Sequence, residues 1–473
     1  MGTISSALSI ATGALDADQE GLNVVANNVA NANTPGYTEE KPDWQENAPI
    51  TVGKVQVGDG VTETGATSQR DRVLERRLDQ QQQLASASST RLTALNDIQA
   101  LFTPDSGSSS STAGDIGSDI TSFFDSFSSL ETNATNNALR EQVLSSASTL
   151  AGDISGAASS LNAQSAAIDQ EASGVASQVN SLTSAIAQLN LEIESSSPDA
   201  DAGTLEDQRQ LDLSKLSQLI GINQVTTENN GLSITTTWGQ LLVSEGQCMQ
   251  LTTGTVNGVT DFFLGGTDIT LQLAAGGGQL GGYLTARDVD IPGALASLDQ
   301  LAYSISTSVN AQNNSGTDLT GATGTVANPL NIFNEPAQVA GSAAAMKVTM
   351  TDPSQIAAAA AGGGTGDNSN AVAMANLASG LIVNGQTTIN YYSNFVSTLG
   401  ATVSEVQTEN TAQNASVTQL QTENNALSSV NLNDEASAMS MLENSYQAAS
   451  QVFTLLNTIM AAALNLGDQT AVA

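Results

Sequence analysis

Few side chains in this sequence are of the types that perform catalysis. It has 47 acidic residues but no histidine, which removes histidine metal sites, catalytic triads and the commonest general base. The single cysteine, Cys248, excludes cysteine-based zinc sites and an internal disulfide, and beside Met249 it is expected to be a small core residue. No complete EF-hand loop or phosphate-binding glycine loop is present. We therefore expect no enzyme activity, no catalytic residues, no cofactor and no metal site.

One short acidic stretch has the residue types that calcium prefers. Asp199, Asp201 and Glu206 supply carboxylates close together in the sequence. Pro198 and Gly203 explain the same stretch as an ordinary loop. The loop is the favoured interpretation, with a weak calcium site as the alternative.

The charge balance limits the classes of partner. The 473 residues suffice for roughly two to four domains. Lys and Arg total 12 against 47 Asp and Glu, a formal net charge of -35, which argues against binding nucleic acid or an anionic membrane. Residues 1–14 lack the basic region of a secretory signal, and no apolar run reaches the length of a membrane span. We expect no nucleic acid partner and no membrane insertion.

Two apolar stripes occupy the two ends of the sequence. Their steps of four and three residues are typical of a coiled-coil seam, and only Asp18 interrupts the first. We expect the two helices to pair, with the remaining apolar surface packing on neighbouring copies. Two ordinary core helices of a monomer are an equally weighted alternative. The stripes comprise Ile4, Leu8, Ala11, Leu15, Leu22, Val25 and Val29, and then Met439, Leu442, Tyr446, Ala449, Phe453, Leu456, Met460 and Ala463.

An asparagine-rich run follows the first stripe and predicts the end of its helix. Asparagine side chains compete with the helix for backbone hydrogen bonds. Pro35 disfavours helical backbone at Thr34, and Pro35-Gly36 suits the centre of a type II turn. The residues of interest in this run are Asn27, Asn28, Asn31, Asn33, Thr34, Pro35, Gly36 and Tyr37.

The run from 26 to 37 resembles the signature of the bacterial flagellar rod, hook and hook-associated axial proteins. Residues 11–25 are similar to the family's lead-in helix and residues 430–466 to its closing helix. Two internal blocks, 204–221 and 279–286, resemble the hook-associated proteins of type 1 and not the rod or hook proteins.

The pattern between the two ends changes several times. Short strands or an extended linker are predicted over 39–67, a long heptad helix over 138–195, and a β region over 222–273. The alternation at 269–273 is assigned to a strand, and the turns of this region to Asn229–Gly231 and Asn257-Gly258.

Several other segments carry predictions of their own. Residues 103–114 are predicted to be a flexible break, 346–350 a strand and 357–366 a disordered tract, and helix returns at about Ala371. Polar residues then occupy slots in another heptad seam: Asn410, Gln413 and Asn424. Four arginines near the start of the second helix are interpreted as a solvated face or, alternatively, as partners of acidic residues on another subunit: Arg70, Arg72, Arg76 and Arg77.

The expected fold class is mainly α with a β-containing portion. It has N- and C-terminal helices paired as a coiled coil, a long helical-bundle rod domain and a small β subdomain. The expected domains are a terminal axial domain (1–37 plus 431–473), the rod domain (38–221 plus 285–312 and 371–430), the β subdomain (222–284) and an irregular Gly/Ala-rich segment (313–370), interpreted as a reduced outer domain.

The resemblance implies a structural protein at the junction of hook and filament, which assembles on the hook tip and supports filament growth and motility. Its implied partners are copies of itself in a ring, the hook protein, the second junction protein, and an export chaperone on the C-terminal helix. Its implied location is the flagellum, outside the cell, reached through the type III export channel.

Three other functions are alternatives: a flagellar hook or rod subunit, a secreted calcium-binding adhesin, and a glycan-processing enzyme supported only by spare carboxylates. The residues expected to carry assembly are Ile4, Leu8, Leu15, Leu22, Val25, Val29, Asn27, Asn28, Asn31, Asn33, Thr34, Pro35, Gly36, Tyr37, Met439, Leu442, Tyr446, Phe453, Leu456 and Met460.

Overall fold

The computed structural model describes residues 2–52, 54–102, 115–196, 201–228, 230–256 and 258–469. The chain divides into two compact units. Unit 1 comprises Met1–Gln83, Gln178–Leu251 and Asn414–Ala473, and unit 2 comprises Leu84–Ser177 and Thr252–Gln413. The architecture is mainly helical with a few small antiparallel sheets, as expected from the sequence.

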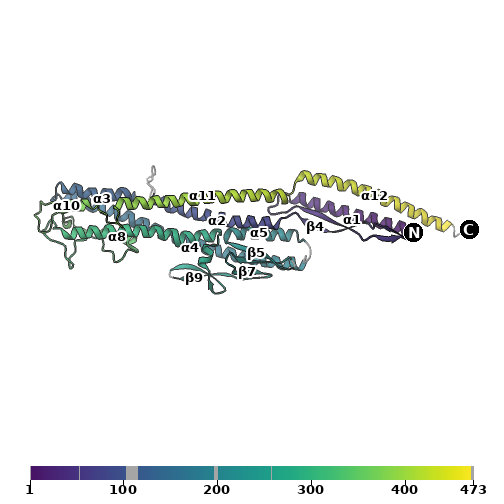
Figure 1. Cartoon of the computed structure of the whole chain (residues 1–473), viewed down its shortest axis with the longest axis horizontal. Coiled ribbons are helices and arrows are strands. Elements are labelled where there is room, and N and C mark those ends of the chain that lie inside the picture. Colours follow the sequence, from purple (N-terminus) through teal and green to yellow (C-terminus); the bar gives the residue numbers. More distant parts are fainter. Residues whose placement is uncertain are drawn as a thin grey trace. The chain divides into compact units, whose positions relative to one another are not determined.

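Unit 1 contains the two terminal helices, α1 (Gly2–Asn31) and α12 (Leu432–Gln469), which lie side by side (Figure 1). Gly21 of α1 faces Leu442 of α12, and Asn28 faces Glu435, so the helices run antiparallel. A Cβ atom added to Gly21 would lie 3.1 Å from Leu442. Glycine therefore permits the close approach at this point, and the predicted pairing of the two chain ends is present.

Four short strands follow α1, in the region where strands or a linker were predicted. β1 (Glu40–Glu46) pairs with β4 (Val61–Ser68), with an irregularity between Asp43 and Trp44, and β2 (Ile50–Val52) pairs with β3 (Val55–Val57). β4 runs beside α1 (Figure 1), where Gly13 meets the carbonyl of Val61. The β1–β4 ribbon thus covers a second side of α1.

The rest of unit 1 is built around a four-stranded antiparallel sheet. Its strands are β5 (Ile222–Thr226), β6 (Leu232–Thr236), β7 (Leu241–Ser244) and β8 (Gln247–Cys248), in that order. The end of α4 (Asn137–Ser196) packs on the sheet, where the amide of buried Asn190 donates to the carbonyls of Leu232 and Glu245. α5 (Thr204–Leu219) leads directly into β5. Asn229, in the first predicted turn, and Asn257, in the second, lie outside the described residues.

Unit 2 is a helical bundle with an aromatic and aliphatic core. It contains α3 (Ile116–Glu131), α7 (Gly278–Thr285), the short π-helix η1 (Ala286–Asp290), α8 (Ile291–Ser315) and α10 (Ser369–Asn376), together with parts of α2 (Arg72–Ala100), α4 and α11 (Thr388–Ser428). α10 lies against α3 and α8 (Figure 1). The heptad residues of α4 in this unit, including Ile154 and Leu161, are buried, and the predicted long helix is confirmed. The segment 103–114 lies outside the described residues.

The strand predicted at 269–273 is wrong. After β9 (Leu251–Val256), β10 (Val259–Leu264) and the two-residue β11 (Thr267–Asp268), the chain forms a helix, α6 (Thr270–Ala274). Ile269 and Leu273 are buried whereas Leu271 is 79% exposed. Two apolar residues four apart also share one face of a helix, so the alternation did not distinguish the two structures.

Residues 313–370 form an irregular but hydrogen-bonded segment that contains α9 (Ser342–Ala345) and the 3₁₀ turn η2 (Pro353–Gln355). The predicted strand at 346–350 is reduced to a single bridge between Phe333 and Val348. The predicted disorder at 357–366 is wrong at its start, because Ala357, Ala358 and Ala359 are buried.

Hydrogen bonds made by two polar side chains, Arg140 and Asn313, explain why this segment is ordered. The fully buried guanidinium of Arg140 donates to the carbonyls of Ala134 and Ile356, and the side chain of Asn313 accepts from the amide of Ala357 at 2.9 Å. Beyond this segment the predicted helix is interrupted. α10 ends at Asn376, and α11 begins only after a turn in which Asn384 and Gly385 have positive φ.

Candidate assembly site at the chain ends

The end of α1 is the first part of the candidate site. The amide of Thr34 donates to the carbonyl of Asn31 at 2.8 Å, and the amide of Tyr37 donates to the carbonyl of Thr34 at 3.2 Å. Gly36 has φ +81°, the left-handed backbone that the third residue of a type II turn requires. The helix stop and turn predicted from the asparagine-rich run are confirmed.

Asn28 is the centre of the polar contacts between the chain ends. Its side chain is 1% exposed. The amide nitrogen donates to Glu435 Oε1 of α12 at 3.0 Å and to the carbonyl of Glu40 at 2.8 Å. The amide oxygen accepts from the Tyr37 hydroxyl at 2.8 Å and from the Glu40 amide at 3.0 Å. Asn28 thus joins the last turns of α1, the following turn, β1 and α12 through all four of its hydrogen bonds.

Burial sets the electrostatics of this junction. Burial raises the pKa of Glu435, and the hydrogen bond from Asn28 opposes that shift. Burial, reinforced by the negative charge of Glu40, also raises the pKa of Tyr37, which keeps its hydroxyl protonated as the donor to Asn28. The contacts are directional and buried, as expected of residues that fix the register of two helices.

A buried ionic network lies next to this junction in unit 1. Asp207 of α5 accepts from the amide of Thr38 at 3.0 Å and from the guanidinium of Arg70. Glu206 pairs with Arg70 at 3.4 Å and with Arg72 at 2.8 Å. The network therefore ties the segment that leaves the terminal pair to the starts of α2 and α5.

The four arginines near the start of α2 therefore differ in their surroundings. Arg70 and Arg72 have partners within this chain, which neither interpretation from the sequence anticipated, whereas Arg76 and Arg77 are exposed. The acidic stretch considered for calcium is likewise occupied by protein donors. Asp201 accepts from the amides of Ser68 and Gly203. Asp199 lies outside the described residues.

The apolar residues of the two stripes lie at graded depths. Val25 and Leu442 are buried, Val29 is 41% exposed and Tyr446 is 38% exposed. Asp18, which interrupts the first stripe, is itself buried. Ala11 is also buried and Ala463 is exposed. The other predicted stripe residues are partly buried: Ile4, Leu8, Leu15, Leu22, Met439, Ala449, Phe453, Leu456 and Met460. Of the predicted turn residues, Asn31 and Tyr37 are partly buried, and Asn27, Asn33, Thr34, Pro35 and Gly36 are exposed.

A second apolar stripe on α12 was missed in the sequence. Met441, Val452, Leu455 and Ile459 are 72%, 50%, 61% and 44% exposed. The last three repeat the steps of three and four residues that define a helix face, so the signal was present beside the first stripe. We name this surface the outer stripe.

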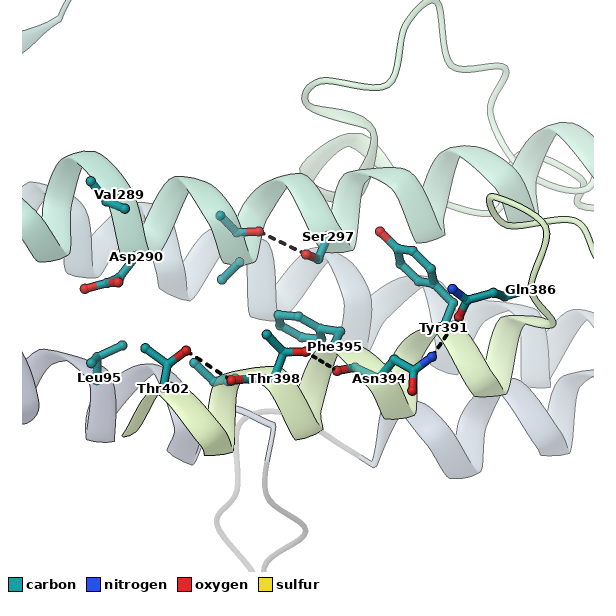
Figure 2. A pocket seen from close by; sticks show the side chains of 13 residues that line it. Leu95, Val289, Asp290, Ser297, Gln386, Tyr391, Asn394, Phe395, Thr398 and Thr402 are labelled. Carbon is teal, nitrogen blue, oxygen red and sulfur yellow. Dashed lines mark hydrogen bonds between the residues drawn. The ribbon is translucent and has the colours of Figure 1, made fainter. Parts of the chain in front are cut away.

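A groove of about 370 Å³ in unit 2 has no catalytic arrangement. It is lined by α2, η1, α8, α11 and the turn before α11, and Figure 2 shows Tyr391 and Phe395 extending from α11 toward α8. Its one acidic residue, Asp290, is held by two hydrogen bonds of 2.9 Å from Arg91. The other polar groups are bound to their neighbours, as in the 2.9 Å hydrogen bond from Asn394 to Gln386.

The described residues contain neither a metal-type cluster of side chains nor a membrane-spanning helix. Within those residues, no cluster of three or more His, Cys, Asp or Glu side chains has the arrangement of a metal site. None of the helices described combines the length and apolarity that crossing a membrane requires.

Comparisons with known proteins agree on one family. Residues 105–326 match the family model described as the flagellar hook-associated protein FlgK helical domain, and residues 8–38 match that of the flagella basal body rod protein. The chain is 26% identical to flagellar hook-associated protein 1 of Bacillus subtilis (strain 168) over 510 residues, covering 97% of each chain. It is 27% identical to the protein of that name from Salmonella typhimurium over 333 residues, which cover 68% of this chain and 59% of the relative.

A solved structure shares the fold. The flagellar hook junction protein FlgK from Burkholderia pseudomallei aligns with a TM-score of 0.64 and 19% identity, over 74% of this chain and 99% of that one. The rod-protein match is confined to the N-terminal helix and its turn, whereas the hook-associated matches extend through the middle of the chain. Together the comparisons confirm the resemblance of this chain to the FlgK family of flagellar hook-associated proteins.

Proposed function

We propose that this chain is a structural subunit of the bacterial flagellum that joins the hook to the filament. The observation that carries the proposal is the similarity over 97% of the chain to a flagellar hook-associated protein 1. Similarity to the FlgK family disfavours the hook or rod subunit, the calcium-binding adhesin and the glycan-processing enzyme. A structural role also agrees with the absence of histidine from the sequence and with a single cysteine.

The mechanism we propose is assembly through the paired ends of the chain. Asn28 and Glu435 fix α12 against α1, and this pairing turns the outer stripe of α12 away from α1. Exposed apolar residues in helical register gain free energy when a second helix covers them, at roughly 25 cal/mol per Å² of apolar surface. We also propose that copies of this chain form a ring that contacts the hook protein and a second junction protein. The division of the chain into the four segments predicted from the sequence belongs to the same proposal.

The route to the flagellum also belongs to this proposal. We propose export through the flagellar type III channel, with a chaperone bound to the C-terminal helix before export. The exposed apolar face of α12 supports this step, because a surface of that kind requires cover until assembly.

The test is deletion of the gene for this chain in its own bacterium. We expect bare hooks by electron microscopy, flagellin released into the medium, and rescue by the full chain. Chains that lack residues 1–30 or 440–473 are expected to leave a folded middle that does not restore filaments. Normal filaments and swimming in the deletion strain would contradict the proposed function.

A further inference from the structure

A polar cavity of about 250 Å³ lies in unit 1, beneath the turn that follows α1. Its walls come from Gly36–Thr38 and from three helices: α2, α5 and α11. The side chains that matter are Glu75, Asp79, Asn424 and Ser428. Neither the ionic network of Arg70 nor the outer stripe accounts for this cavity.

Asp79 is the most unusual group in its wall, because it is a carboxylate with 1% exposure. Its Oδ2 atom accepts from Gln210 at 3.1 Å and from Gln224 at 2.8 Å. Its Oδ1 atom has no hydrogen-bond partner among the described residues. Both donors are neutral, and burial raises the pKa of Asp79 to about 6. A buried carboxylate normally has a cationic partner, whereas the hydrogen-bond donors described for Asp79 are two neutral amides.

Two other residues of the same wall also have a buried oxygen atom without a described hydrogen bond. Asn424 Oδ1 and Ser428 Oγ, one turn apart on α11, are buried and make no hydrogen bond within the described part of the chain. Glu75 lies one turn before Asp79 on α2 and is also buried. Two helices therefore place residues that carry carboxylate, amide and hydroxyl groups in the wall of one cavity.

We propose that this cavity binds a hard divalent cation through oxygen ligands, with Ca²⁺ as the preferred ion. Ca²⁺ accepts a mixture of carboxylate, amide and water oxygens in flexible geometry, whereas Mg²⁺ requires near-octahedral sites and retains its water. Glu75 and Asp79 supply the two negative charges, Asn424 and Ser428 supply neutral oxygens, and water occupies the remaining positions. With only two carboxylates the affinity is expected at about 10⁻⁴–10⁻³ M, the range of extracellular calcium modules.

The proposed calcium site does not depend on the proposed flagellar role. It is also distinct from the loop containing Asp201, whose carboxylate accepts from backbone amides. A filled site would cross-link α2 and α11 directly below the turn of the terminal pair. Calcium would then stabilise unit 1 without forming any contact between subunits.

The test is isothermal titration of the full, metal-stripped chain with CaCl₂ and, separately, with MgCl₂, in a choline chloride buffer. We expect saturable binding of one Ca²⁺ per chain and weaker binding of Mg²⁺. Asp79→Asn keeps the shape of the side chain and is expected to lower the Ca²⁺ affinity at least tenfold. Glu423→Gln is the matched control, because it removes one exposed carboxylate from α11 beside Asn424 and is expected to leave the affinity unchanged.

Other results would overturn the proposal. These are no saturable Ca²⁺ binding, tighter binding of Mg²⁺ than of Ca²⁺, or equal binding by the parent and Asp79→Asn; the cavity would then hold only water or another ion. Should Asp79→Asn fail to fold, the double variant Asn424→Leu/Ser428→Ala, which leaves both carboxylates in place, is expected to show the same loss of Ca²⁺ binding. Unchanged binding by that variant would overturn the proposal equally.

Discussion

The side-chain amide of Asn28 in α1 donates a hydrogen bond of 3.0 Å to Glu435 in α12, across 407 positions of sequence. Both side chains are buried. A polar pair of this kind specifies one register between two helices, because every other register leaves its groups without partners. The signature at the end of α1 therefore acts as a helix stop and also as the point at which the two chain ends are matched.

Replacing Asn28 with alanine is expected to weaken the terminal pair strongly. The change leaves the carboxylate of Glu435, the backbone of Glu40 and the hydroxyl of Tyr37 without their partner. Since each buried polar group left unpaired costs about 1–3 kcal/mol, we expect a loss of about 3–5 kcal/mol in chemical unfolding followed by circular dichroism. The control is Asn27→Ala at the exposed neighbouring position, for which a change above about 1 kcal/mol is not expected.

Gly21 offers a test of how closely the two helices approach. A Cβ atom there meets Leu442 at 3.1 Å and Trp44 at 3.2 Å, so Gly21→Ala forces one of these side chains to move. We expect a lower midpoint of thermal unfolding, although alanine is the better helix former. Gly174→Ala in α4 has open space around the new methyl group and is expected to raise the midpoint. A stabilising effect of Gly21→Ala would contradict the packing described here.

The ionic network predicts that replacing Arg70 lowers stability much more than replacing Lys41. The side chain of Arg70 is 7% exposed and pairs with both Glu206 and Asp207. Arg70→Met leaves these carboxylates undercompensated, at an expected cost of about 3–5 kcal/mol in urea unfolding. The Lys41 side chain, 58% exposed and paired with Glu39 at 3.5 Å, is the control. Lys41→Met is expected to change stability by less than about 0.5 kcal/mol.

The carboxyl group of Asp119 in unit 2 predicts that the stability of the fold depends on pH. Burial, with a contribution from neighbouring Asp153, raises the pKa of Asp119 from 3.8 to about 7. Between these values the unfolded chain loses a proton that the folded chain retains, so stability falls as pH rises through this window. Asp119→Asn is expected to reduce the fall in midpoint between pH 4 and pH 8. The exposed Asp125→Asn on the same helix is the control, and equal pH profiles for the two variants would refute the prediction.

The sequence predicted the elements that have a strong period. The seven-residue repeats of α4 and the stop at Pro35-Gly36 were confirmed, because periodicity and turn chemistry are local properties of the chain. The strand at 269–273 failed, since a short stretch with two apolar residues four apart satisfies helix and strand alike. The buried Ala357–Ala359 could not be predicted, because their order depends on Arg140 and Asn313, both distant in sequence.

The candidate site was only partly accessible to sequence reasoning. The residues of the two stripes and of the turn could be named, but their contacts could not. Asn28 meets Glu435, and Arg70 meets Asp207 across 137 positions, so no spacing rule relates these partners. The division into four segments and the assembly role of the stripe residues stay predictions.

The most direct test of the central claim is the fraction of hooks that carry a filament when the outer stripe is made polar. Val452→Ser/Leu455→Ser changes two exposed residues of α12, so the thermal midpoint is expected to stay close to that of the parent. The control is Gln451→Ser/Asn457→Ser, two exposed polar positions of the same helix. Each variant is supplied to the deletion strain, and the amount exported into the medium is measured alongside the electron micrographs. The account predicts bare hooks with the outer-stripe variant and filaments with the control, whereas normal filaments with both variants would contradict it.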